Sequence, residues 1–221
     1  MTDLVKPPRA SFTSFEESTK EDWDLIMSQR GELEGSLPDR ILEQMEHLRN
    51  DYGGFPVDRL EHSVQTATRA ERDGRDDEYV LCALLHDLGD PLAPFNHPEI
   101  AAAIVKPFVS EANHWMVEHH GIFQGYYFWH HIGLDRNTRD RFSDHKYYDR
   151  CEEFCAEYDG PAFDPKYQSN PIEHYEPLIR DVFGHGLNPV SYTHLRAHET
   201  LRYLVFRLLG GKKNRGGGGG G

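Results

Sequence analysis

Residues 82–99, CALLHDLGDPLAPFNHPE, place a histidine and an aspartate at the end of a nearly continuous apolar run. His86 and Asp87 follow directly on that run, and His97 comes eleven residues after His86. A buried charged group is costly unless it is paired or binds a metal. Two interpretations are therefore open: the pair is a polar helix end, or it belongs to a metal site.

The apolar residues on both sides of this stretch recur at helical spacing, and no segment shows the sustained alternation of a strand. We therefore expect an all-α fold, a bundle of helices. The expected helices are a short one from about Thr19 and others within 34–54, 57–67, 76–90, 97–109, 111–131, 136–145, 146–158 and 171–183.

Several polar residues are suited to begin or end these helices. The TKED stretch at 19–22 resembles a capping box. Ser36 and Ser110 are expected to cap the helices that follow them. Gly53 and Gly54 are expected to end the helix that begins near Ser36.

The chain divides by composition into three parts. Residues 1–18 are expected to form an irregular arm, 19–187 one metal-dependent domain, and 188–221 a tail of a different kind. The tail is basic and ends in six glycines, whereas the preceding chain is acidic. Part of it, VSYTHLRAHETLRYLV, resembles a translated sequencing-adapter sequence, so we interpret the tail as non-native.

The net charge and the distribution of apolar residues indicate which classes of binding partner and which cellular location to expect. The net charge of −13 argues against nucleic acid, because phosphate contacts need clustered Lys and Arg. No apolar run reaches the roughly 20 residues that span a membrane, and the N-terminus lacks a signal-like segment. Three cysteines fit a reducing compartment. We expect a cytoplasmic protein with a small-molecule substrate.

Six residues along the chain form a candidate ligand series: His62, His86, Asp87, His97, His120 and Asp159. Imidazole and carboxylate ligands suit Fe, Mn or Zn. Four histidines and two aspartates exceed the needs of one ion, and a carboxylate can bridge two. Alternatives remain at three positions. His97 is also placed to cap a helix, His119 competes with His120, and Asp149 and Asp164 compete with Asp159.

The order His62, His86–Asp87, Asp159 resembles the HD-domain superfamily, an all-α fold of metal-dependent phosphohydrolases and their relatives. His97 and His120 match the subset that binds two metals. Within that subset the sequence most resembles the mixed-valent di-iron oxygenases, which include inositol oxygenase and enzymes that cleave hydroxylated aminoethylphosphonates. The resemblance covers roughly residues 35–183.

The resemblance implies two iron ions that cycle between Fe²⁺ and Fe³⁺, with Mn²⁺ or another divalent metal as the alternative. One iron would take His62, His86, Asp87 and Asp159, and the other Asp87, His97 and His120. Small-molecule substrate and O₂ would bind at the metals. The implied reaction breaks a C–H bond and then a C–P or C–C bond.

Other site residues follow from the same resemblance. Tyr52, ten residues before His62, matches a tyrosine that lies over the iron until substrate displaces it. Gln124 stands where the phosphonate enzymes carry a lysine that contacts the anionic group, so the substrate is expected to differ. Two more roles are predicted from the residues themselves. Tyr126 belongs to the aromatic run GYYFWHH, residues 125–131, which either lines the substrate pocket or packs in the core, and Gln65, about one turn from His62, is expected to orient a ligand or water near the substrate.

The sequence differs from these relatives at two further positions, and two other functions remain as alternatives. Phe55 replaces a glutamate of the phosphonate enzymes, and Asp90 stands where many relatives have His or Lys. The same ligands would serve a metal-dependent phosphohydrolase, since two metals activate water and stabilise a leaving oxygen. A non-catalytic ligand-binding HD module is the third alternative.

Overall fold

A computed structural model describes residues 8–184, and within that range every regular element is a helix. The expectation of an all-α fold is confirmed. The elements are η1 (Phe15–Glu17), α1 (Lys20–Gly35), α2 (Leu37–Glu46), α3 (Arg59–Arg72), α4 (Asp77–Leu85), α5 (His97–Val105), α6 (Glu111–Phe128), η2 (Trp129–Ile132), η3 (Arg136–Phe142), α7 (Tyr148–Glu153), η4 (Phe154–Asp159) and α8 (Ile172–Gly184). The residues expected to form the C-terminal tail lie outside the described range.

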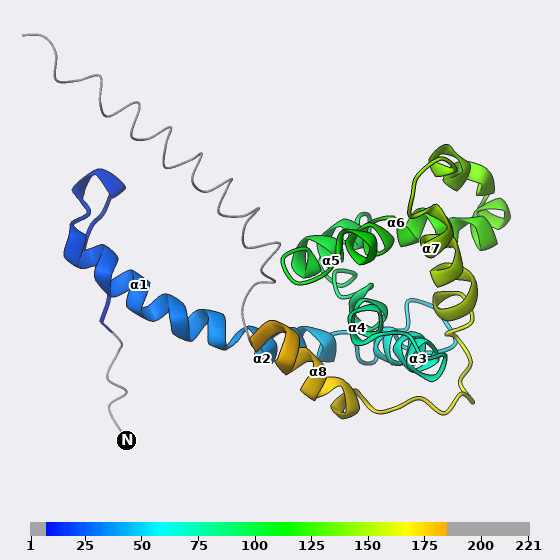
Figure 1. The fold of residues 1–221 in the computed structure, drawn as a ribbon, viewed down its shortest axis with the longest axis horizontal. Helices are drawn as coiled ribbons and strands as arrows, with labels where there is room; N and C mark the ends of the chain where they lie inside the picture. Colours follow the sequence, from blue (N-terminus) through cyan, green and yellow to red (C-terminus); the bar gives the residue numbers. More distant parts are fainter. Residues whose placement is uncertain (1–7, 185–221) are drawn as a thin grey trace, which may run out of the picture.

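Helix α4 lies at the centre of the bundle, packed against α3, α6 and α8 (Figure 1). Its residues 79–85 are all buried, which explains why the sequence there is apolar on every side of the helix. Helices α5 and α6 pair on one side of α4, and α2 pairs with α8 on another. The carboxyl end of α4 is thus surrounded by other helices, and this is where His86 and Asp87 occur.

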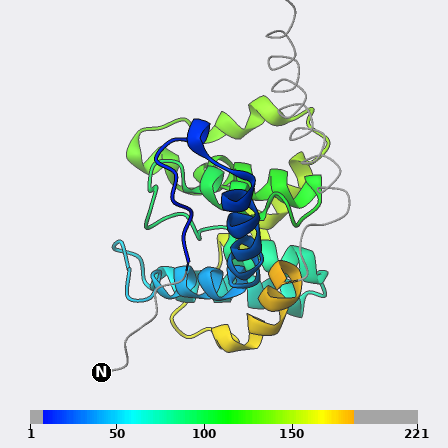
Figure 2. The same cartoon turned by 90° about the vertical axis from the view of Figure 1, so that its left-hand side faces the viewer.

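Helix α1 extends away from the other helices (Figures 1 and 2). Thr19 begins it with the expected capping box, because its side chain accepts from the Asp22 amide while Asp22 accepts from the Thr19 amide. No residue of α1 is buried. The helix therefore contributes little to the core that positions the site.

Helix α2 departs from expectation at both ends. It ends at Glu46, before Gly53 and Gly54, because residues 47–50 form tighter turns and Asn50 adopts φ 63°. Asparagine tolerates this left-handed conformation better than most residues. Ser36 gives no side-chain cap and instead donates a 2.9 Å hydrogen bond to the Leu33 carbonyl.

The segment 146–158, expected to be one helix, consists of α7 and a following π-helical turn, η4. A π-helix adds a residue to the turn and occurs frequently at functional sites. Here it ends at Asp159, which is fully buried. No helix within the described residues is long and apolar enough to cross a membrane.

Gly89 lies where α5 approaches the end of α4, and its lack of a side chain allows this close approach. A Cβ atom added there would lie 2.7 Å from Ile100 Cβ and 2.8 Å from the His97 carbonyl oxygen. We expect Gly89→Ala to lower the free energy of unfolding by about 1–3 kcal/mol, because overpacking displaces neighbours. Chemical denaturation measures this. Gly31→Ala in α1 is the control, since nothing lies within 4 Å of its added Cβ; a similar loss in both variants would contradict the prediction.

Candidate metal centre

The six predicted ligands come from five parts of the fold and meet near the carboxyl end of α4. His62 lies on α3, His86 and Asp87 follow α4, and His97 begins α5. His120 lies on α6, and Asp159 ends η4. All are buried except His97, whose side chain is 21% exposed.

Asp87 lies between two pairs of histidines. Its Oδ2 atom is 3.5 Å from Nε2 of both His62 and His86. Its Oδ1 atom is 3.2 Å from Nε2 of both His97 and His120. Each carboxylate oxygen therefore faces a separate pair, which is the arrangement that a bridging carboxylate requires.

Asp159 completes the half of the cluster that contains His62 and His86. Its Oδ1 atom lies 3.2 Å from His62 Nε2 and 3.7 Å from His86 Nε2. Its Oδ2 atom is buried without a hydrogen-bond partner among the described residues. A buried carboxylate oxygen without a donor is readily explained as a metal ligand.

The tautomers of three histidines follow from their backbone contacts. Nδ1 lies 3.1 Å from the Ala162 carbonyl in His62, 2.8 Å from that of Ala83 in His86, and 2.7 Å from that of Val117 in His120. A carbonyl only accepts, so we assign the proton to Nδ1 in each ring. In the neutral form of each ring the Nε2 lone pair then points into the cluster, as metal ligation requires; in the protonated form Nε2 donates to a carboxylate instead.

Two of those lone pairs face one another directly. Nε2 of His62 lies 3.1 Å from Nε2 of His86. Two unprotonated nitrogens repel at this distance, and a shared proton or a cation between them removes the repulsion. In two groups, His62–His86–Asp159 and His86–Asp87–His120, the ligand atoms lie within 4.8 Å of one another. The residues present therefore fit a centre for metal ions.

The electrostatics also favour cations. Burial opposes ionisation of Asp87, but the charge of His86 and hydrogen bonds from His120 and His97 lower its pKa well below the usual value. Burial likewise opposes ionisation of Asp159, and hydrogen bonds from His62 and His86 outweigh it, so its pKa is lowered. Burial alone would lower the pKa of His86, but Asp87 and Asp159 raise it to about 9. Two ionised carboxylates thus lie in the centre.

Two of the competing residues, His119 and Asp164, have partners outside the cluster. His119 stacks on Trp115, with ring centroids 4.2 Å apart. The Asp164 carboxylate accepts from the Lys166 amide. Cys151 and Cys155 are buried free thiols, and Cys155 donates to the carbonyl of His120 at 3.4 Å.

Of the other predicted site residues, Gln124 touches a candidate ligand. Its Nε2 donates a 2.9 Å hydrogen bond to Asp159 Oδ1. Tyr52 is 51% exposed, and Gln65 donates to the Asp164 carbonyl at 2.9 Å. Tyr126 lies under the guanidinium groups of two arginines on η3, Arg136 and Arg139. The substrate roles of Tyr52, Gln65 and Tyr126 stay predictions.

Sequence reasoning missed the aromatic residue that covers His62. Phe163 stacks on the His62 ring, with centroids 4.3 Å apart and planes 18° apart. Phe55 in turn stacks on Phe163 at 5.2 Å. Phe163 lies four residues after Asp159 in an irregular segment, and no pattern there distinguishes it from a packing residue.

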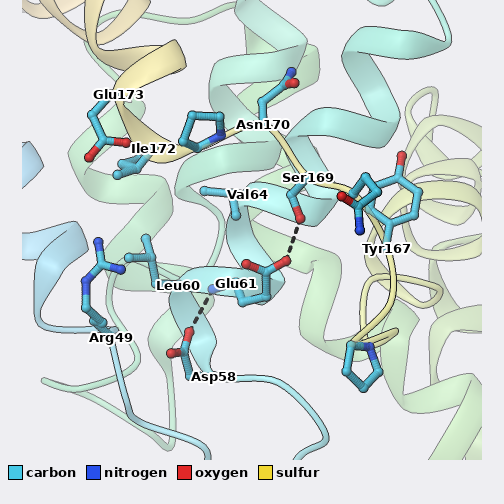
Figure 3. A pocket seen from close by; sticks show the side chains of 13 residues that line it. Arg49, Asp58, Leu60, Glu61, Val64, Tyr167, Ser169, Asn170, Ile172 and Glu173 are labelled. Atoms are coloured by element: carbon cyan, nitrogen blue, oxygen red, sulfur yellow. Dashed lines mark hydrogen bonds between the residues drawn. The ribbon is translucent and has the colours of Figure 1, made fainter.

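A polar cavity of about 460 Å³ lies on another side of α3 (Figure 3). It is lined by Leu60, Glu61 and Val64 of α3, by Arg49 and Asp58, and by Pro165 and residues 167–173. Glu61 accepts a hydrogen bond from Ser169 inside it. None of the six predicted ligands lines this cavity, so it is distinct from the candidate metal centre.

Removing the Gln124 donor tests how far it supports Asp159. Gln124→Leu keeps much of the volume but leaves Asp159 Oδ1 without this donor. We expect metal affinity to fall about 10–100-fold, as is typical for partners of metal ligands. Competition with a chromogenic chelator measures this. Gln168→Leu, whose amide donates to Lys166 in the loop 165–171, is the control; equal affinities for both variants would refute the prediction.

Comparison with known families agrees with the geometry. A family model described as "HD domain" matches residues 59–157, which include His62, His86, Asp87, His97 and His120. Residues 59–157 are therefore similar to the HD domain, a fold whose members bind divalent metals.

A curated protein of Leisingera caerulea is also similar. It is a [1-hydroxy-2-(trimethylamino)ethyl]phosphonate dioxygenase (glycine-betaine-forming), 35% identical over 69 residues. The match covers 26% of this chain and only 35% of the relative's length. Together, the family match, this relative and the His/Asp clusters support an HD-domain metalloenzyme.

Proposed function

We propose that the protein is a di-iron oxygenase that uses O₂ to oxidise a small hydroxylated substrate. The observation that carries the proposal is the position of Asp87, with each carboxylate oxygen facing its own pair of histidines. This arrangement supports two ions joined by one bridging carboxylate.

The donor set supports iron and also permits manganese. Four imidazoles and two carboxylates suit borderline and hard metals, and no thiolate enters the cluster. His62, His86, Asp87 and Asp159 would hold one ion; Asp87, His97 and His120 would hold the other. When bound, the pair supplies activation of O₂ and oxidation of the substrate C–H bond.

The chain's own residues would orient the ligands and limit access of water. Backbone carbonyls fix the rings of His62, His86 and His120, and Gln124 holds Asp159. Phe163 covers the ring of His62. Apolar walls of this kind exclude water, which protects reactive species from side reactions.

The similar protein from Leisingera caerulea provides a balanced reaction as a precedent. A 1-hydroxyphosphonate, R–CH(OH)–PO₃H₂, and O₂ give the carboxylic acid R–COOH and H₃PO₄. The C–H and C–P bonds break, and O₂ takes all four electrons, so no further reductant is consumed. We propose the same reaction class here, with C–P or C–C cleavage according to the substrate.

The charge around the ligands favours this function over phosphoester hydrolysis. Within residues 8–184, none of the six ligands forms a recorded ion pair with Lys or Arg. A phosphohydrolase needs such groups to bind phosphate charge, and an oxygenase acting on a phosphonate needs them too, so an oxygenase acting on an uncharged hydroxylated substrate is favoured. At the position where the relatives carry a lysine, the chain has the uncharged Gln124.

Metal analysis and EPR of the full chain test the proposal. We expect about two irons per chain and, after partial oxidation of the reduced protein, the EPR signal of a coupled Fe(II)/Fe(III) pair. O₂ consumption with a panel of hydroxylated phosphonates and polyols then identifies the substrate class. Zn or Mn without the mixed-valent signal, together with hydrolysis of phosphomonoesters, would instead establish a phosphohydrolase.

A further inference from the structure

His97 is held differently from the other three histidines of the cluster. His62, His86 and His120 each direct Nδ1 at a backbone carbonyl. Nδ1 of His97 is buried but has no hydrogen-bond partner among the described residues. The side-chain carboxylate of Asp90 lies 3.5 Å from it, at ion-pair distance. His97 therefore depends on a side chain where the others depend on the backbone.

The segment before His97 exposes two large apolar side chains. His97 is the first residue of α5 and follows a segment that contains the exposed Leu92 and Phe95. Phe95 is fully exposed. Both side chains are therefore exposed rather than packed beside His97, and the Nδ1 side of the His97 ring has the Asp90 carboxylate as its neighbour.

Asp90 is itself held by Arg59. Asp90 is buried, 6% exposed, and pairs through Oδ2 with Nη1 of Arg59 at the start of α3. The same guanidinium binds Asp51, with Nε 3.1 Å from Asp51 Oδ2. One arginine thus connects the buried carboxylate beside His97 with the segment 51–55.

The segment 51–55 packs closely around Arg59 and also reaches the other half of the cluster. Gly53 has φ +51°, and a Cβ atom added to it would lie 2.9 Å from Arg59 Nη2. Phe55 stacks on Phe163, which stacks on His62. The segment is therefore linked to His97 through Arg59 and Asp90, and to His62 through Phe55 and Phe163.

We propose that Asp90 and Arg59 are positioning residues that hold His97 toward its metal ion and link that ion to the segment 51–55. The inference rests on the dimetal centre of the proposed function. A carboxylate on the second nitrogen of a ligating histidine fixes the ring and raises its basicity. Arg59 pairs with the buried Asp90 carboxylate and holds it in place beside His97, since a buried charge needs a partner.

Titration of the chelator-stripped full chain with Mn(II), followed by calorimetry, tests the proposal. We expect the unaltered protein to bind two ions. Asp90→Asn should weaken one of them about 10–100-fold and leave the other unchanged, because only the His97 side loses its support. Arg49→Gln is the control, since Arg49 pairs with Glu46 at the protein surface.

Hydrogen exchange gives a second readout that a merely structural role would not change. Mn(II) should slow amide exchange in residues 51–55 of the unaltered protein, and should slow it less in Asp90→Asn, where the link through Phe55 and Phe163 to His62 remains. Arg59→Lys keeps the charge but loses the planar fork that binds two carboxylates, so it should reproduce both effects in part.

The outcomes separate this inference from the proposed function. An unaltered protein that binds fewer than two ions overturns the proposed function and this inference with it. Two ions bound equally tightly by the unaltered protein and Asp90→Asn overturn this inference alone. If Asp90→Asn does not fold, Arg59→Lys decides: weakening of one ion supports the proposal, and unchanged affinity for both overturns it.

Discussion

The Asp87→Asn variant is expected to bind less than one metal ion per chain and to lose catalytic activity. In the structure the two oxygens of Asp87 face separate histidine pairs, so one substitution affects both ions. Asparagine keeps the size of the side chain but removes its charge and one acceptor. The loss of affinity should exceed the ~10–100-fold typical for groups outside the ligand set. Metal content after gel filtration, and chelator competition, measure it.

Asp164→Asn is the matched control for this substitution. Asp164 lies five residues after Asp159, and its carboxylate contacts the Lys166 amide, away from the histidine cluster. The control is expected to keep the metal content of the unaltered chain. If Asp87→Asn keeps two tightly bound ions, a bridging role for Asp87 is wrong. If Asp164→Asn loses one instead, the choice of Asp159 as the ligand is wrong.

Residue periodicity was sufficient to predict most of the fold, because helical packing leaves a clear pattern in the sequence. The spacing of Leu60, Val64 and Ala67 predicts α3, and all three are buried. The serine before α6 caps it as expected. The predicted end of α2 was wrong, because the turns that lead to Asn50 end the helix before Gly53 and Gly54. Local turn geometry of this kind is weakly encoded in residue type.

The candidate ligands could be predicted from the sequence because histidine and aspartate in an apolar stretch have few roles other than binding a metal or another polar group. His62, His86 and Asp87 are unusual in buried helices, and the structure brings them together with His97, His120 and Asp159. The supporting contacts were not predictable. The link from Arg59 to Asp90, the cover by Phe163 and the backbone carbonyl of Ala162 depend on how distant segments meet. A charged or aromatic residue in an irregular segment gives no sign of such a contact.

Removing the metal from the unaltered chain is expected to lower its melting temperature by about 8–16 °C. The ligands lie on elements from α3 to η4, so bound ions cross-link helices that are distant in the sequence. An ion present at 1,000 times its dissociation constant stabilises the folded state by about 4 kcal/mol. In a chain of this size, each kcal/mol moves the melting temperature by about 2–4 °C. Thermal unfolding monitored by circular dichroism, with chelator and after reloading with Fe(II) or Mn(II), measures the shift.

The Asp87→Asn variant separates this cross-linking from general effects of the chelator. Its melting temperature should respond much less to chelator or added metal, because the residue between the two histidine pairs is changed. The melting temperature of Asp87→Asn should also be close to the melting temperature of the unaltered chain without metal, because replacing one buried ligand leaves most of the apolar core intact. If chelator lowers both melting temperatures equally, the stabilising ions bind elsewhere. If it changes neither, the His/Asp cluster does not hold metal tightly enough to act as a catalytic centre.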